Sequence, residues 1–273
     1  MAVTNFIPSV WEARLIEKFH ARSVAKAITV PPTKIEGNKI IYNVVSDIAV
    51  KDYSGTVTFD ELTTPKREIN MDQKKYWAFK VGDVDKVQAA GELIDPHVRE
   101  AGAVLQETAD KFVLGLYASA HADNKLGTQE APIEVDKTNI YDTIVDINKK
   151  LDKKRVPRSG RFITINADIL GMLEKDDRFT RNYTVLENGI LDGAKINGSQ
   201  LVLSEDVDTT SEVIKVIANH NTAIGYGEQL QETEALRLES DFADGVRGLA
   251  VYGGQVLRPE GVAVGVLKIK TTP

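Results

Sequence analysis

Lys39-Ile-Ile-Tyr-Asn-Val-Val-Ser-Asp-Ile-Ala-Val50 is the first arm of a sequence pattern that predicts a long β-hairpin. Its β-branched and aromatic residues favour a strand. A second arm is predicted from Thr56 to Val81, after turn residues at 52–55. Around Ile69 and Met71, apolar and polar residues alternate, which places the apolar ones on one face. A two-stranded ribbon is at best marginally stable alone in water. The rest of the chain, a neighbouring copy or a ligand must therefore bury this face.

Helices are predicted on both sides of the hairpin. Apolar residues recur at helical spacing from Ser9 to Ile28, and this helix either closes its own domain or packs on another subunit. A longer helix is predicted from Asp95 to about Ala122, which is ~39 Å at 1.5 Å per residue and suits a spine across a flat subunit. Its expected apolar face consists of Val98, Ala101, Leu105, Thr108, Phe112 and Leu116.

The middle third of the chain has an α/β pattern, and the last third is predicted to be all strand. Helices are expected at 139–153 and, capped by Asn166, up to Glu174, with strands at 161–165, 201–203 and 213–218. The later strands are expected at 235–239, 246–252 and 262–269.

Composition excludes several classes of protein. Of the 273 residues, 42% are hydrophobic and 27% are charged, which is typical of a globular protein. The formal net charge of −6 provides no chain-wide basic field for nucleic acid. Without cysteine there is no disulfide and no thiolate metal site. We expect a protein made in the cytoplasm, because no apolar run approaches the ~20 residues of a membrane span and the N-terminus lacks a signal-peptide pattern.

No catalytic signature is present in the sequence. Phosphate-binding loops, a spaced dinucleotide fingerprint and a nucleophile elbow are all missing. The four histidines, at 20, 97, 121 and 220, lack the spacing of a metal pair. Glu174-Lys-Asp-Asp-Arg178 gathers three carboxylates, which form either a cation or acid/base site or, as we favour, a solvated helix end. We therefore predict no catalytic, metal-binding or cofactor-binding residue.

The order of these parts resembles the major capsid protein of tailed bacteriophages, which has the Hong Kong ninety-seven type fold. Four stretches carry the resemblance, and they are Phe6-Ile-Pro-Ser-Val-Trp-Glu-Ala-Arg-Leu15, residues 71–85, residues 156–179 and Phe242 to Val262. The first is similar to the N-terminal arm of one large group of these proteins. The others are similar to the return of the hairpin, the opening of the axial domain and the closing peripheral strands.

The resemblance implies an α+β fold with five parts. They would be an N-terminal arm at 1–34, an extended hairpin (E-loop) at 35–82, a spine helix with the first part of the peripheral domain at 83–135, an axial α/β domain at 136–226 and C-terminal strands of the peripheral domain at 227–273. The hairpin would lie over an adjacent subunit, which would bury its apolar face.

The resemblance also implies a function and partners. Many copies, as pentamers and hexamers, would form an icosahedral shell around double-stranded DNA, contacting it non-specifically, with no membrane involved. Because only some 34 residues precede the hairpin, a separate scaffolding protein or none is expected, together with a portal and possible decoration proteins. The protein would be located in the virion and assembled in the cytoplasm of a bacterial host.

One departure concerns covalent cross-linking. The founding member of the family joins a lysine of the E-loop to an asparagine of the peripheral domain. Lys51 and Lys66 are possible donors here, but no asparagine follows Asn221. We therefore predict no isopeptide cross-links, and expect burial of the hairpin and arm, with interface charges, to stabilise the shell.

Two other functions remain open at this stage. An encapsulin-like compartment would share the fold but enclose an enzyme, and a soluble α/β enzyme would use the cluster around Asp176 and Asp177. We favour a structural, non-enzymatic shell subunit. Its expected interface residues are Trp11 and Arg14 in the arm, Tyr53, Phe59, Lys66 and Arg67 in the hairpin, and the salt-bridge candidates Arg178 and Arg258.

Overall fold

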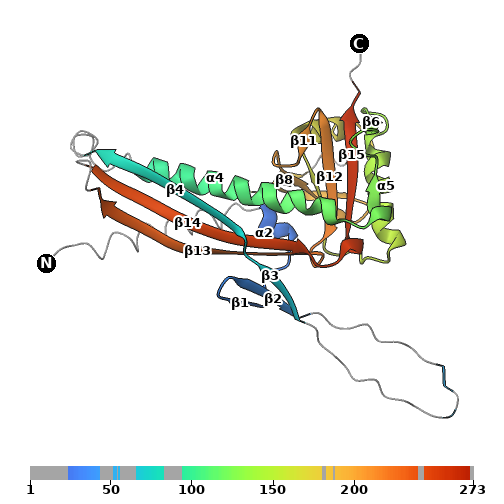
Figure 1. Cartoon of the computed structure of the whole chain (residues 1–273). Helices are drawn as coiled ribbons and strands as arrows, with labels where there is room; N and C mark the ends of the chain where they lie inside the picture. The colour runs from blue at the N-terminus through green and yellow to red at the C-terminus, as the bar shows by residue number, and fades with distance from the viewer. Residues whose placement is uncertain are drawn as a thin grey trace.

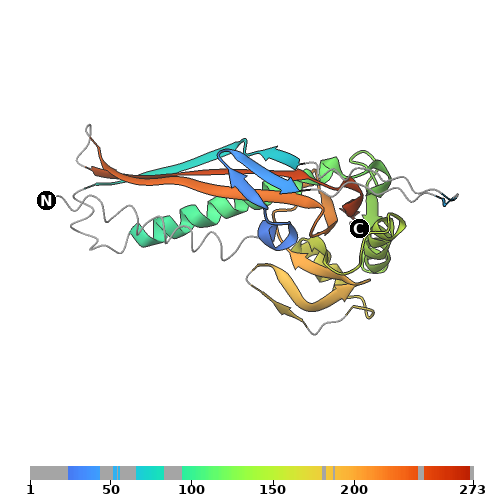
Figure 2. The ribbon, with the colours of Figure 1, turned by 90° about the horizontal axis from the view of Figure 1, so that it is seen from below.

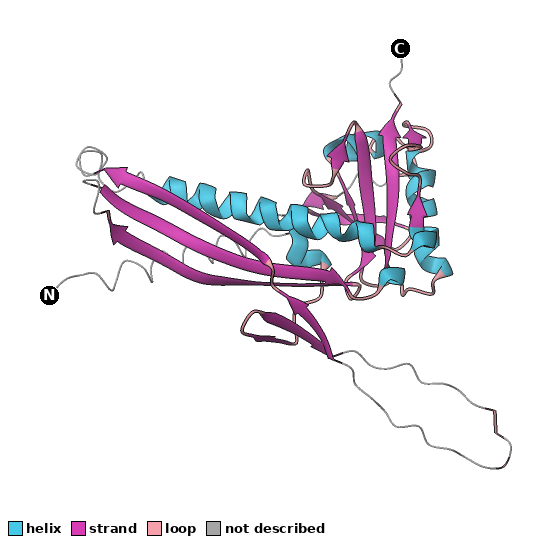
Figure 3. Cartoon of the chain, in the orientation of Figure 1, coloured by secondary structure: helices cyan, strands magenta, loops and turns pink. Residues whose placement is uncertain are grey.

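The computed structural model of the chain describes residues 24–43, 52–53, 55, 66–82, 94–179, 183–186, 188–238 and 243–270. It has an extended arm and a compact end (Figure 1). Strands dominate both parts, and a long helix follows the arm (Figure 3). The expected α+β class is confirmed. The predicted helix from Ser9 lies outside the described residues except for its last turn, α2 (Val24–Ile28).

A three-stranded antiparallel sheet forms the extended arm. Its order is β13 (Ile224–Arg237), β14 (Ala243–Val256) and β4 (Gln73–Gly82). Helix α4 (Ile94–Gly115) covers one face of this sheet, where Phe112 meets Tyr252 edge to face with ring centroids 5.4 Å apart. The 3-10 helix η2 (Leu116–Ser119) continues α4 toward the compact end (Figure 1).

The buried face of α4 differs in part from the predicted one. Leu105, Ala109 and Val113 are buried, whereas Thr108 and Phe112 are only half-buried. The prediction followed apolar residues alone and passed over Asp110, which is also buried. Because α4 packs on α2 as well as on the sheet, its buried stripe is rotated from the predicted one.

The root of the hairpin is a second, smaller sheet that we call the hairpin root. It consists of β1 (Lys34–Glu36), β2 (Lys39–Asn43) and β3 (Lys66–Asn70), all antiparallel. It lies on one face of the three-stranded sheet of the extended arm, which we call the long sheet, and α4 lies on the opposite face (Figures 1 and 2). The predicted pairing of the two arms is thus confirmed at the root. The second arm was predicted too long, because β4 leaves the hairpin and pairs with β14.

The compact end is a nine-stranded mixed sheet, counted over the described residues. The main path runs β5 (Lys125–Leu126), β15 (Val262–Ile269), β12 (Val213–His220), β7 (Arg161–Ile165), β10 (Ser199–Leu203), β9 (Ile190–Ile196) and β8 (Thr184–Val185). Off this path, β6 (Ile133–Val135) pairs with β15 and β11 (Thr209–Thr210) with β12. Two further 3-10 helices are η3 (Ala122–Asn124) and η4 (Pro259–Gly261).

Helices α5 (Ile140–Lys153) and α6 (Ala167–Leu173) pack on this sheet and match the prediction closely. The predicted apolar face of α5 is fully buried at Ile140, Ile144, Ile147 and Leu151. Asn166 caps α6 by accepting a hydrogen bond from the backbone N–H of Ile169, as expected for an asparagine at this position.

One continuous hydrophobic core joins the extended arm, formed by the long sheet and α4, to the compact end. It includes α2, the last turns of α4, α5, the central strands of the compact sheet and Tyr226 and Tyr252 of the long sheet. The range expected for the C-terminal strands, 227–273, spans both sheets, because β15 lies in the compact sheet beside β12. The predicted domain boundaries thus do not coincide with a break in the core.

Candidate assembly surfaces

The hairpin root is buried by the chain's own long sheet. Ile40, Tyr42, Ile69 and Met71 form a cluster with Val251 of β14. Glu68 and Asn70, which alternate with the apolar residues, are exposed as predicted. Of the three candidates for covering the apolar face, the rest of the chain therefore covers it at the root.

Glycines of the long sheet make room for this contact. A Cβ at Gly225 would lie 2.8 Å from the ring of Tyr42, and one at Gly227 would lie 2.8 Å from Ile40. A Cβ at Gly253 would lie 2.5 Å from the backbone oxygen of Asn70. At these three positions the hairpin root and the long sheet approach each other closely, because glycine places no side chain between them.

Two residues make polar contacts between the hairpin root and the rest of the chain, Tyr42 on the central strand β2 and Arg67 on the edge strand β3. The Tyr42 hydroxyl lies 3.1 Å from the carbonyl oxygens of Val30 and of Tyr226, so its single proton is shared between two acceptors. Burial raises the pKa of Tyr42 to about 12, so it stays a donor at neutral pH. The Arg67 guanidinium donates to the carbonyl oxygen of Leu257 at 2.8 Å.

The other hairpin residues predicted for the interface are exposed or lie outside the described residues. Tyr53 is 77% exposed, and Lys66 is exposed at the start of β3. Trp11, Arg14 and Phe59 are outside the described residues, so their predicted roles stay predictions.

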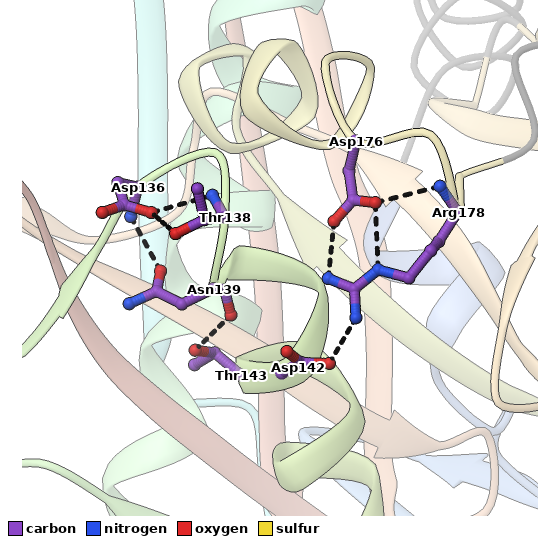
Figure 4. Close-up of polar contacts among 7 residues, drawn as sticks. All are labelled: Asp136, Thr138, Asn139, Asp142, Thr143, Asp176 and Arg178. Atoms are coloured by element: carbon purple, nitrogen blue, oxygen red, sulfur yellow. Dashed lines mark hydrogen bonds and ion pairs between the residues drawn. The ribbon is translucent and has the colours of Figure 1, made fainter.

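Arg178 is held by carboxylates of its own chain (Figure 4). Its guanidinium donates to both oxygens of Asp176, which lies two residues earlier, and to Asp142 of α5 at 2.7 Å. It also lies over the ring of Tyr141, 4.7 Å from the centroid. The side chain is still 47% exposed, so the predicted contact with another subunit stays a prediction.

Hydrogen bonds from the Arg178 side chain and backbone lower the pKa of Asp176 to about 2. Next to this cluster, Asp136 accepts hydrogen bonds from the hydroxyl and the N–H of Thr138, and these lower the pKa of Asp136 (Figure 4). The carboxylates at this end of α5 thus act as ionised structural groups that organise the loop and helix ends.

Arg258 lies at the other end of the compact sheet. It is exposed, caps the start of η4 and donates its backbone N–H to the carbonyl oxygen of Ala223. This position is beside Leu257, the acceptor of Arg67. The structure therefore places Arg67 and Arg258 in one region, and Arg178 in another.

Asp110 is a structural residue that the sequence patterns missed. Its carboxylate accepts hydrogen bonds from the backbone N–H groups of Val24 and Ala25, at 3.2 and 2.9 Å. A carboxylate from α4 thus caps the first turn of α2, where backbone donors lack partners within the helix. The sequence offered one signal for this role. Asp110 lies on a side of the predicted spine helix where the other residues, such as Ala109 and Val113, are small or apolar.

A second missed cluster joins η2 to the compact sheet. The hydroxyl of Tyr117 donates to Asp208 at 2.7 Å, and Asp208 also pairs with the buried Lys215. Burial alone would raise the pKa of Asp208, but hydrogen bonds from Lys215, Thr210 and Tyr117 outweigh it and lower that pKa. The cluster ties the end of the spine to the strand β12.

A groove of about 510 Å³ runs between β4 and α4. Trp77 and Phe79 line it from β4, with rings stacked at 5.5 Å, and Val104 and Leu105 line it from α4. At its rim, Tyr76 is 80% exposed and Val104 49% exposed. Large exposed apolar residues grouped in this way are typical of association surfaces.

The described residues contain no group of three or more His, Asp or Glu side chains arranged to hold a metal ion. Among these residues, no helix combines the length and the apolar character that crossing a bilayer requires.

Comparison with known proteins gave matches among solved structures. A chain from Mycobacterium phage Che8 is 28% identical, with a TM-score of 0.65 over 84% of this chain and 85% of that chain. The capsid of Ralstonia phage GP4 aligns with a TM-score of 0.70 at 11% identity, over 93% of this chain and 92% of that chain. The chain has the major-capsid fold of the tailed phages.

The expected capsid fold is thereby confirmed over most of the chain. A virus-like particle from Pyrococcus furiosus has the same fold, at 16% identity and a TM-score of 0.62, over 95% of this chain and 99% of that chain. The encapsulin alternative is not favoured, because the 28% identical structure is from a phage. No family model matches the sequence, and no curated protein does.

Proposed function

We propose that this protein is the major capsid protein of a tailed bacteriophage, which assembles into an icosahedral shell around double-stranded DNA. The observation that carries the proposal is the match, at 28% identity and over 84% of this chain, to a chain from a mycobacteriophage. In this proposal, the hairpin root that packs on the long sheet would carry the segment that contacts a neighbouring copy.

The five predicted parts are kept as proposed functional regions. The arm (1–34) and hairpin (35–82) would contact neighbouring copies, and the axial domain (136–226) would meet its copies around fivefold and sixfold axes. The spine region (83–135) and the C-terminal strands (227–273) would form the peripheral domain. Strand β15 belongs to the proposed peripheral domain by its residue numbers, but it pairs with β12 of the proposed axial domain. The two domains would therefore share one sheet.

A structural role without catalysis fits the chemistry of the one cluster that suggested an enzyme. Asp176 is paired with Arg178, and its pKa of about 2 is far below that of an efficient general base near neutral pH. The proposal therefore assigns no cofactor and no reaction to this chain.

The partners are proposed from the capsid role. They are copies of this chain in pentamers and hexamers, a portal, a scaffolding protein, possible decoration proteins and the packaged DNA. Assembly would take place in the cytoplasm of a bacterial host.

Light scattering with electron microscopy of the purified protein tests this function. Closed polyhedral shells, or pentamers and hexamers, are the expected result, and DNA rather than a cargo protein is expected in shells from infected cells. A compact dimer or tetramer that stays unassembled when scaffolding protein is supplied would contradict the proposal.

A further inference from the structure

The hairpin root touches the rest of the subunit through few polar contacts, and these go to backbone carbonyls. Arg67 on β3 reaches Leu257, which follows β14. Tyr42, its register partner on β2, reaches Val30 and Tyr226. Two neighbouring positions of one ribbon are thereby tied to three separate segments of the chain.

The residues that carry these three acceptors are themselves held by backbone pairing, Tyr226 through its register with Gly254 in the long sheet. The N–H of Val30 donates to the carbonyl oxygen of Ile224, and the N–H of Leu257 donates to that of Ala223. The acceptors thus lie around the start of β13, where the long sheet meets the compact sheet. A ribbon bonded there has a defined direction relative to both parts of the subunit.

Apolar packing alone leaves this direction loosely defined. Beneath the ribbon, Val251 packs against its apolar side chains, but the neighbouring Gly225, Gly227 and Gly253 offer no side chains to interlock with it. Hydrogen bonds are directional, whereas apolar contact is not. The orientation of the ribbon therefore depends on the contacts of Tyr42 and Arg67.

We propose that Tyr42 and Arg67 are positioning residues that set the direction in which the hairpin leaves the subunit, and thereby the curvature of the shell. This inference rests on the proposed capsid function. It assigns Arg67 a role within its own subunit, in place of the direct contact with a neighbour that the sequence suggested.

Four variants of the full chain test the inference, with particle diameter measured by electron microscopy. Arg67→Gln alters the contact to Leu257, Tyr42→Phe removes the contacts to Val30 and Tyr226, and Arg67→Lys keeps a cationic donor for Leu257. Lys39→Gln is the matched control, because it also removes one positive charge from the ribbon but breaks an ion pair, Lys39 to Glu68 at 2.7 Å, that is internal to the ribbon. Melting temperatures of the unassembled subunits confirm that all four variants fold.

We expect Arg67→Gln and Tyr42→Phe to lose the uniform shell diameter of the wild type, while Arg67→Lys and Lys39→Gln retain it. Tyr42 is decisive because it is only 4% exposed in the subunit and has little surface to offer a neighbour. If Arg67→Gln alters the shells and Tyr42→Phe does not, Arg67 contacts a neighbour directly and the inference is wrong. Unchanged shells in both variants, or equal changes in Lys39→Gln, would also overturn it.

A measurement on the subunit separates this inference from the proposed function. The chain has no cysteine, so Lys66→Cys and Gln255→Cys introduce two labels without background. Both positions are exposed, one on the hairpin root and one on β14. The label-to-label distance distribution should broaden in Arg67→Gln and not in Lys39→Gln. If it does not broaden, the positioning role fails whether or not shells form. Failure of the wild type to assemble when scaffolding protein is supplied rejects the capsid function instead.

Discussion

Single carboxylates, one buried and one half-buried, join elements that lie far apart in the sequence. Asp110 connects α4 to α2, and Asp208 connects η2 to β12. Each is held by several donors, so losing the carboxylate leaves donors without partners in a buried environment. At the residue scale, stability therefore depends on a few polar side chains as well as on the core.

Replacing Asp110 with alanine should destabilise the subunit by roughly 1–3 kcal/mol, because two backbone donors of α2 lose their acceptor. The free energy of urea unfolding measures the loss. Glu107→Ala is the control, since this residue forms an exposed ion pair with Lys111 and should cost at most about 0.5 kcal/mol. If the two variants lose the same free energy of unfolding, the cap from Asp110 contributes no more to stability than an exposed ion pair does.

Asp176 should make stability depend on acid pH. Its pKa is lowered from 3.8 to about 2 in the folded chain, so the folded state binds this proton less readily than the unfolded state. The stabilisation is present above about pH 4 and is lost as the pH falls toward 2. The difference in urea midpoint between wild type and Asp176→Asn should shrink over that interval, and a constant difference would contradict the assignment.

At the scale of elements, the hairpin root approaches the backbone of the long sheet closely at the glycines beside Val251. Gly253 faces the backbone oxygen of Asn70 and the Cα of Met71, neither of which can move like the end of a flexible side chain. The hairpin root can approach the long sheet this closely because Gly253 has no side chain.

Gly253→Ala should cost roughly 1–3 kcal/mol, the usual range for overpacking, because its Cβ would lie 2.5 Å from Asn70. Gly115→Ala is the matched control. Gly115 has helical backbone angles and open space around its Cβ position, so alanine should leave stability unchanged or raise it by up to about 1 kcal/mol. Thermal unfolding of both variants distinguishes the two effects, and a neutral Gly253→Ala would refute the close contact.

The sequence predicted some elements well because their environment is simple. Helix α5 packs one face on one sheet, so its apolar spacing defined it completely. The partner of β4 could not be predicted, because an alternating strand has the same pattern whichever strand it pairs with. The polar contacts of Arg67, Arg178 and Asp110 depend on segments brought together by the fold, and no local pattern encodes them.

At the scale of the whole molecule, we expect a shell of this protein to be held together by non-covalent contacts between copies. The founding member's cross-link needs an asparagine in the peripheral strands, and none follows Asn221. Assembled shells should therefore dissociate in hot detergent to a single band of 30.0 kDa. Denaturing electrophoresis with mass spectrometry checks this, and a ladder of multimers containing a lysine–asparagine bond would contradict it.

The placement of the hairpin root on β14 has a mechanical consequence. β14 is the central strand of the long sheet, bonded to β13 on one edge and to β4 on the other. A force that pulls on the root along this strand loads both ladders in shear, so many hydrogen bonds must break together rather than one after another. Directly after Val251, on which the root packs, the strand enters the common core at Tyr252 and Val256. Because only Met71 and Asp72 separate β3 from β4, tension applied to the hairpin is thus carried into the body of the subunit through β4 and its ladder with β14.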